Sequence, residues 1–197
     1  MILLIDNYDS FTHNLAQLLG RTHAVMICRN DDPQVFQAAE QAAAIVLSPG
    51  PGTPAETGYV ALIIQQFYQK KPILGICLGH QTIGAVFGGE VIQAKNIRHG
   101  KQSTITISPA SRLLKKVPKH TRVMRYHSLV LQEQELPQAF TITARANDDQ
   151  EIMAIEHQHY PLFGLQFHPE SIGTQYGAAI LQNFIELTEE YDDENNF

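Results

Sequence analysis

The chain has 197 residues, 44% of them hydrophobic and 17% charged, and a formal net charge of −6. A chain of this length can bury a sizeable core as one domain, and its hydrophobic fraction excludes an intrinsically disordered protein. No apolar run approaches the roughly 20 residues that span a bilayer. With two cysteines, no CxxC pair and no leader pattern after Met1, we expect a protein of the reducing cytoplasm.

The negative charge is concentrated at the C-terminus. Six acids and no base follow residue 185, and these acids account for the whole net charge. The rest of the chain is therefore neutral overall and offers no broad cationic face for nucleic acid. We expect one domain over residues 1–190 and an acidic tail over residues 191–197 that frays in solvent.

The first half of the chain alternates short apolar runs with segments of helical periodicity, which is typical of a parallel sheet covered by helices. Asp9 or Ser10 is expected to cap the first helix, and Phe11 begins its apolar stripe. In chain order we expect a strand at 2–5, a helix from about residue 10, a strand at 24–28, a helix at 33–43, a strand at 44–47, a rigid loop of prolines and glycines at 48–54, a helix at 59–68, a strand at 73–76 and a helix at 78–87.

The pattern changes after Gly88 and Gly89. Apolar residues now recur with period two, at 104–107, 140–144 and 151–155, which predicts mostly antiparallel strands. A further strand at 162–167 and a helix at 174–190 end the pattern. We find no internal repeat and no low-complexity linker, so the sequence predicts a single α/β domain.

Cys77 stands where an apolar strand meets a helix, in the pattern Gly-x-Cys-x-Gly. This is the spacing of a nucleophile elbow, with sulfur in place of the serine oxygen. The glycines allow a sharp turn, and a helix N-terminus stabilises a thiolate. Taken alone, a free cysteine is more often a small core residue, and that remains our expectation for Cys28. The elbow spacing favours Cys77 as a nucleophile.

A thiol nucleophile needs a base, and nine histidines are available. His168 has the best context, because Pro169 holds its neighbour extended and lets Glu170 reach the imidazole, as the acid of a triad must. A surface turn with a His and a Glu is the alternative. His80, one helical turn after Cys77, is expected to be a contact between helix and sheet. His157 and His159 could form a weak metal pair, but a solvated strand edge is the expected setting.

Three motifs together resemble the class I glutamine amidotransferases: residues 74–81 around Cys77, residues 167–171 around His168, and the loop at 48–52. Residues 5–12, 98–101 and 125–129 resemble a branch of that family, the amidotransferase subunits of anthranilate synthase and aminodeoxychorismate synthase. The resemblance implies a flavodoxin-like, mostly parallel sheet with helices on both faces and a smaller antiparallel β lobe.

The resemblance also implies a reaction. Cys77 attacks the side-chain amide of glutamine, and His168, oriented by Glu170, accepts the thiol proton and protonates the leaving ammonia. The oxyanion is expected on the N–H of Leu78 and on the glycine-rich loop, with Gly52 as the favoured donor. A γ-glutamyl thioester remains and is hydrolysed by water.

The same resemblance implies further contacts with the substrate. Gln81 and the main chain of Ser128 and Leu129 are expected to hold the amino-acid end of glutamine, and Gly50 and Pro51 belong to the oxyanion loop. The chain itself is expected to need no metal or other cofactor. Ammonia is expected to pass through a closed channel to a chorismate-binding partner subunit, which would use Mg²⁺, and no nucleic acid or membrane partner is implied.

Two positions depart from the family pattern, namely His13 in place of an aromatic residue and Arg98 in place of an apolar one. Both are expected at or near the partner-facing surface. Two other functions stay open: a stand-alone γ-glutamyl hydrolase on the same scaffold, and a catalytically silent regulatory subunit. Whether the ammonia serves anthranilate for tryptophan, aminodeoxychorismate for folate, or both is also open.

Overall fold

The computed structural model describes residues 1–195 and contains one mixed nine-stranded sheet. Its strands are β1 (Ile2–Asp6), β2 (Val25–Arg29), β3 (Ala44–Leu47), β4 (Ile73–Ile76), β6 (Lys101–Ile107), β7 (His120–Arg125), β9 (Phe140–Ala146), β10 (Ile152–His157) and β11 (Leu162–Leu165). They lie in the order β2-β1-β3-β4-β11-β10-β9-β6-β7. The first five in this order are parallel to one another, and the rest are antiparallel. A separate pair joins β5 (Val91–Gln93) to β8 (Leu129–Leu131).

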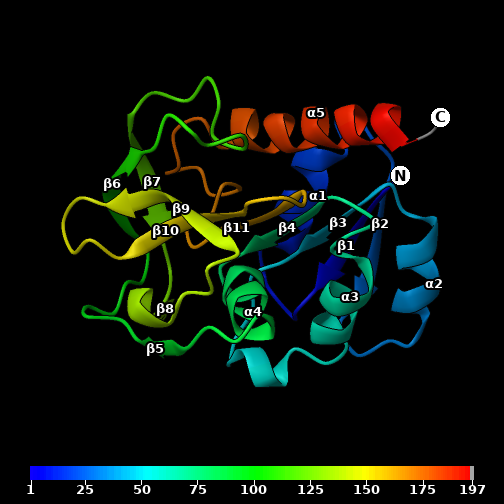
Figure 1. Cartoon of the computed structure of the whole chain (residues 1–197), viewed down its shortest axis with the longest axis horizontal. Helices are drawn as coiled ribbons and strands as arrows, with labels where there is room; N and C mark the ends of the chain where they lie inside the picture. The colour runs from blue at the N-terminus through cyan, green and yellow to red at the C-terminus, as the bar shows by residue number, and fades with distance from the viewer. Residues whose placement is uncertain (196–197) are drawn as a thin grey trace.

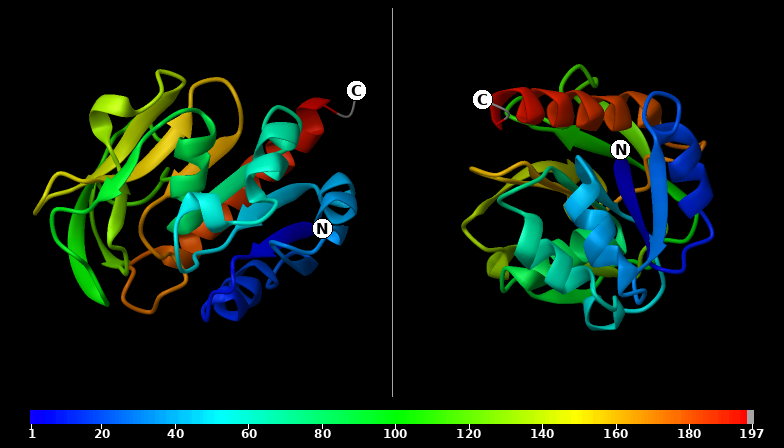
Figure 2. Two further views of the ribbon diagram at one scale, coloured as in Figure 1. Left: turned by 90° about the horizontal axis from the view of Figure 1, so that it is seen from below. Right: turned by 90° about the vertical axis from the view of Figure 1, so that its right-hand side faces the viewer.

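Helices cover both faces of the parallel strands because the strand side chains are apolar on both faces (Figures 1 and 2). Along β1, Ile2 and Leu4 pack in one core cluster, and Leu3 and Ile5 pack in the other. The first cluster includes residues of α1 (Thr12–Leu19) and α5 (Gly177–Asn195). The second includes residues of α2 (Gln34–Gln41), α3 (Val60–Phe67) and α4 (Leu78–Val86).

The predicted division into a parallel first half and an antiparallel second half is confirmed. The antiparallel strands do not form a detached lobe, however, because β10 pairs directly with β11 and extends the same sheet. Ala154 lies opposite Leu165 at this junction. One edge of the parallel strands is thereby closed, and the last residues of β4 and β11, Ile76 and Leu165, are fully buried.

The start of α1 differs from the prediction. Its N-cap residue is Phe11, and no side chain caps the helix there. Asp9 instead accepts a hydrogen bond from the Phe11 N–H at 2.7 Å, and Asp6 accepts one from the Thr12 hydroxyl at 2.7 Å. The two carboxylates therefore shape the turn before the helix, and Phe11 lies outside the helix.

The C-terminal helix α5 runs on to Asn195, so residues 191–195 of the expected tail are helical. The Tyr191 hydroxyl donates to the carbonyl of Gln69 at 3.1 Å, which attaches this end to the body. Residues 196–197 lie outside the described residues, and the division at residue 190 stays a prediction. No helix within residues 1–195 combines the length and apolarity needed to cross a membrane.

Candidate active site

Cys77 forms a sharp turn between β4 and α4. Its backbone has φ 52° and ψ −100°, a conformation that non-glycine residues rarely adopt and that costs about 1–3 kcal/mol. Its N–H donates to the carbonyl of Leu165 on the neighbouring strand at 2.7 Å, which ties the turn to the sheet. The side chain is only 7% exposed. The predicted nucleophile elbow is therefore present, with the sulfur at the N-terminus of a helix.

The two glycines of the elbow are needed for close packing. A Cβ on Gly75 would lie 2.5 Å from the carbonyl carbon and oxygen of Gly79. A Cβ on Gly79 would lie 2.7 Å from the Cβ and carbonyl oxygen of Leu47 on β3. Because these neighbours are mainly backbone, they cannot move aside, and the start of α4 is fixed against β3 and β4.

His168 and Glu170 form the predicted pair. The Nδ1 of His168 lies 2.6 Å from the Oε1 of Glu170, and both side chains are buried. The geometry differs from the extended segment expected around Pro169, because the Ser171 N–H donates to the His168 carbonyl and closes a turn. A backbone hydrogen bond also fixes His168, since its N–H donates to the Met124 carbonyl at 3.1 Å. The pairing is confirmed, but a turn produces it.

The surroundings of His168 favour its protonated form. Burial disfavours the imidazolium, but the side chains of Cys77 and Glu170 outweigh this effect and raise the pKa of His168 to about 10. Two aromatic rings meet the imidazole edge to face, Tyr126 at 4.9 Å and Phe11 at 6.2 Å between centroids. The Nε2 is buried without a well-oriented hydrogen-bond partner in residues 1–195. This nitrogen is available for proton transfer beside Cys77.

A chain of amides leads from the expected substrate contacts to the nucleophile. The Nε2 of Gln81 donates to the Leu129 carbonyl at 2.9 Å and to the Oε1 of Gln166 at 3.1 Å. The Nε2 of Gln166 in turn donates to the Sγ of Cys77 at 3.6 Å. Gln166 is fully buried and was not among the predicted site residues. In the sequence, only its position between a buried strand and His168 indicated a role for Gln166 in the site.

The predicted oxyanion loop lies against the elbow. A Cβ on Gly50 would lie 2.4 Å from the carbonyl oxygen of Asn7 and 3.1 Å from a methyl group of Leu78, so the loop packs closely on the start of α4. Pro51, Gly52 and Leu78 line one cavity of about 520 Å³. Leu78 opens α4, where the first N–H groups have no partner within the helix. Neither Cys77 nor His168 lines this cavity, so the oxyanion site at the N–H groups of Leu78 and Gly52 stays a prediction.

Two further buried histidines lie near the site, and both are neutral. Burial lowers the pKa of His80 to about 3. Burial, and then the positive charge of Arg125, lower the pKa of His127 to about 3. His80 also lies against Gly164 of β11, since a Cβ there would be 2.5 Å from its Nδ1. His80 is thus a contact between helix and sheet, as predicted.

These neutral histidines predict that the folded state loses stability in mild acid. Their folded pKa lies below the ordinary value of about 6.5, so as pH falls from 7 to 5.5 the unfolded chain gains protons that the folded chain does not. We expect each to remove about 1 kcal/mol over this interval. The raised pKa of His168 acts in the opposite direction, since its contribution is complete below pH 6.5 and is lost as pH rises toward 10.

Urea unfolding at pH 7.0, 6.3 and 5.5 tests this prediction, with an expected net loss of about 1–2 kcal/mol toward pH 5.5. His80→Leu serves as the matched variant, because it removes one of the two titrations and should flatten the pH dependence. A free energy of unfolding that is constant or rises toward pH 5.5 contradicts the assignment of neutral buried histidines.

Other sequence candidates lie elsewhere. Cys28 is buried on β2, as expected of a core residue. His157 is buried among the rings of Tyr68, Phe87 and other aromatic residues, so the expected solvated edge was wrong there. His13 is exposed, and Arg98 is partly buried near the surface, where its guanidinium pairs with two aspartates. That these two residues face a partner stays a prediction. Within residues 1–195, no group of three or more His, Cys, Asp or Glu side chains could hold a metal ion.

The α/β fold, the elbow at Cys77 and the buried His168–Glu170 pair together define a class of protein, and similarity to known proteins identifies the same class. The chain belongs to the family described as glutamine amidotransferase class-I, whose model matches residues 3–187. It is similar to anthranilate synthase component 2 of Lactococcus lactis subsp. lactis, at 47% identity over 100% of this chain and 99% of that protein. It is also similar to aminodeoxychorismate/anthranilate synthase component 2 of Bacillus subtilis, at 43% identity over 94% of this chain and 96% of that protein.

Among solved structures, the chain is similar to a Thermoplasma acidophilum protein assigned to GMP synthase. The TM-score is 0.89 at 28% identity, over 100% of this chain and 97% of that one. The shared fold therefore extends to a protein with a different synthase name, and the predicted fold class is confirmed.

Proposed function

We propose that the chain hydrolyses L-glutamine and supplies ammonia to a chorismate-binding synthase subunit. The main observation behind this proposal is the strained turn at Cys77 together with the buried His168–Glu170 pair, in which the His168 Nδ1 lies 2.6 Å from the Glu170 Oε1. A thiolate at a helix N-terminus, a protonated imidazole and an orienting carboxylate are the parts that amide hydrolysis through a thioester requires. The similarity to component 2 proteins over the whole chain supports the partnership.

In the proposed reaction, the Sγ of Cys77 attacks the side-chain amide carbon of glutamine. The oxyanion is stabilised by the N–H groups of Leu78 and Gly52. His168 gives a proton to the nitrogen as the carbon–nitrogen bond breaks, so ammonia leaves and a γ-glutamyl thioester remains. His168 then takes a proton from water as water attacks the thioester, and glutamate is released with the thiolate restored.

The remaining site residues have binding roles in this proposal. Gln81 and the main chain of Ser128 and Leu129 receive the amino-acid end of glutamine, and Gly50 and Pro51 shape the oxyanion loop. The hydrogen bond from Gln81 to the Leu129 carbonyl places two of these groups in contact. Ammonia is used before it is protonated in bulk water, which is the reason for a closed passage into the partner. We place this reaction in the cytoplasm, with any Mg²⁺ on the partner.

The test is glutamate release by this chain alone and mixed in turn with the large subunits of anthranilate synthase and aminodeoxychorismate synthase, with chorismate present. We expect at least one large subunit to stimulate release and to form its aminated product. Stimulation by one assigns the pathway, and stimulation by both indicates a shared subunit. Release that neither subunit changes, together with turnover of γ-glutamyl peptides, contradicts the proposal and favours the stand-alone hydrolase.

A further inference from the structure

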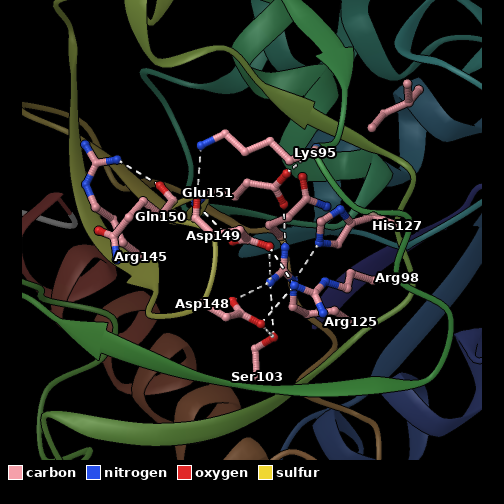
Figure 3. A network of polar contacts seen from close by, with 12 residues as sticks. Lys95, Arg98, Ser103, Arg125, His127, Arg145, Asp148, Asp149, Gln150 and Glu151 are labelled. Carbon is pink, nitrogen blue, oxygen red and sulfur yellow. Dashed lines mark hydrogen bonds and ion pairs between the residues drawn. The ribbon is translucent and has the colours of Figure 1, made fainter.

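An ionic cluster centred on Arg125 lies beside His127, the residue that precedes the Ser128–Leu129 segment proposed to bind glutamine (Figure 3). At its centre, Arg125 of β7 has no exposed side-chain surface. Its guanidinium pairs with Asp148 at 3.2 Å, with Asp149 at 2.9 Å and with Glu151. Burying an arginine is costly unless its donors are satisfied, so these three carboxylates hold it in one orientation.

The cluster also reaches the surface through Arg98. One nitrogen of its guanidinium lies 2.9 Å from a carboxylate oxygen of Asp148 and 2.9 Å from one of Asp149. Burial raises the pKa of Asp149, but its hydrogen bond from Arg98 and the charge of Arg125 outweigh burial and leave that pKa below its usual value. Asp149 therefore stays charged. Both arginines pair with the same two aspartates.

The two terminal nitrogens of the Arg125 guanidinium face the carboxylates and the Ser103 hydroxyl, and its Nε is directed at His127. The Arg125 Nε donates to the His127 Nε2 at 3.0 Å. A guanidinium has no acceptor, so this ring nitrogen must carry a lone pair. His127 is consequently a neutral imidazole with its proton on Nδ1, and its ring has one fixed orientation. The ring is buried, at 3% exposure.

His127 begins a stretch in which three consecutive carbonyls are fixed by three different donors. The His127 carbonyl accepts from the Arg98 N–H at 3.0 Å, and the Ser128 carbonyl accepts from the Ala94 N–H at 2.8 Å. The Leu129 carbonyl accepts from the side chain of Gln81 at 2.9 Å. The chain is thus fixed at every residue from 127 to 129, and the ring of His127 anchors its first residue to the cluster.

We propose that His127 is a positioning residue for glutamine binding. The Arg125 cluster holds His127 in place, so the main chain of Ser128 and Leu129 keeps the geometry that binds the amino-acid end of the substrate. This inference rests on the proposed function. It assigns a role in recognition to a cluster that contains none of the triad residues. Loss of the ring acceptor leaves the Arg125 Nε unpaired and frees the start of the segment. We therefore expect the affinity for glutamine to fall while the reactivity of Cys77 is retained.

The experiment compares His127→Met with His127→Gln. The two side chains are similar in length, but the methionine sulfur is only a weak acceptor for Arg125, whereas the glutamine amide oxygen is a good one. Labelling of Cys77 by the diazoketone analogue of L-glutamine, followed by mass spectrometry, reports on the substrate site. Labelling by iodoacetamide reports only on thiolate reactivity. For His127→Met we expect the half-saturating concentration of the analogue to rise about tenfold, with the iodoacetamide rate within about twofold of wild type. For His127→Gln we expect both values to lie close to wild type.

Asp148→Asn provides a second variant, because it weakens the cluster from its exposed side without leaving a cavity. We expect a smaller rise in the same half-saturating concentration, by about threefold. The inference is overturned if His127→Met leaves this concentration unchanged, if both labelling rates fall together, or if His127→Gln is as impaired as His127→Met. Should His127→Met fail to fold, an unchanged value for Asp148→Asn overturns it. If wild-type Cys77 is not labelled by the analogue at all, the proposed function itself fails.

Discussion

Cys77→Ser is expected to lower glutamate release from glutamine by at least about a thousandfold, because a serine hydroxyl is a much weaker nucleophile than a cysteine sulfur. The serine keeps the size of the side chain, so the strained turn and the core should persist. Steady-state glutamate release, measured with the stimulating large subunit present, gives the rate. Far-ultraviolet circular dichroism verifies the fold.

Cys28→Ser is the matched control, because Cys28 is equally buried at 7% exposure but lies on β2 away from the elbow. It should leave the rate within about twofold of wild type and cost stability alone, by about 1 kcal/mol. Glutamate release that survives in Cys77→Ser, or that is lost in Cys28→Ser, contradicts the assignment of the nucleophile.

The same substitution should change the titration of His168. The Cys77 side chain is one of the groups that raise the pKa of His168 to about 10, while burial lowers it. Without the sulfur, we expect the pKa of His168 to fall and its ring to be less protonated at neutral pH. Titration of the His168 ring protons by NMR, in wild type and Cys77→Ser, measures the shift. An unchanged or higher pKa would show that sulfur and imidazole do not interact.

The elbow could be predicted from sequence because its causes are local. A buried strand, two glycines spaced around the cysteine and a following helix define the turn, and the contacts of Gly75 and Gly79 explain why both positions need glycine. The His168–Glu170 pair was equally local, although the turn closed by Ser171 and not an extended segment brings the two side chains together.

The rest of the site depends on register between distant strands, which periodicity does not give. Gln166 and Gln81 meet only because β11 lies next to β4 and α4 follows β4. The Arg125 cluster takes its acids from the turn between β9 and β10, where Asp148 and Asp149 look like ordinary solvated loop residues in the sequence. The strands β5, β7 and β8 were missed because they are short or rich in polar and charged side chains.

Gly79→Ala is expected to lower the free energy of unfolding by about 2–3 kcal/mol. The new methyl group would lie 2.7 Å from the Cβ and carbonyl oxygen of Leu47, so β3 and α4 must separate. Alanine favours helices over glycine by about 1 kcal/mol, and the clash must exceed this gain. Urea unfolding of the variant and wild type measures the difference.

Gly84→Ala is the matched control, because Gly84 lies on the same helix and is also buried. Its new methyl group would lie 2.2 Å from a terminal carbon of the buried Leu131 side chain, which can shift more readily than the backbone carbonyl that Gly79 faces, so we expect a smaller cost, of about 1 kcal/mol. We expect glutamate release to fall more in Gly79→Ala than in Gly84→Ala, because displacement of α4 from β3 also moves Cys77 and the Leu78 N–H. If Gly79→Ala costs no more than Gly84→Ala, or keeps full activity, close packing at Gly79 does not hold the nucleophile in place.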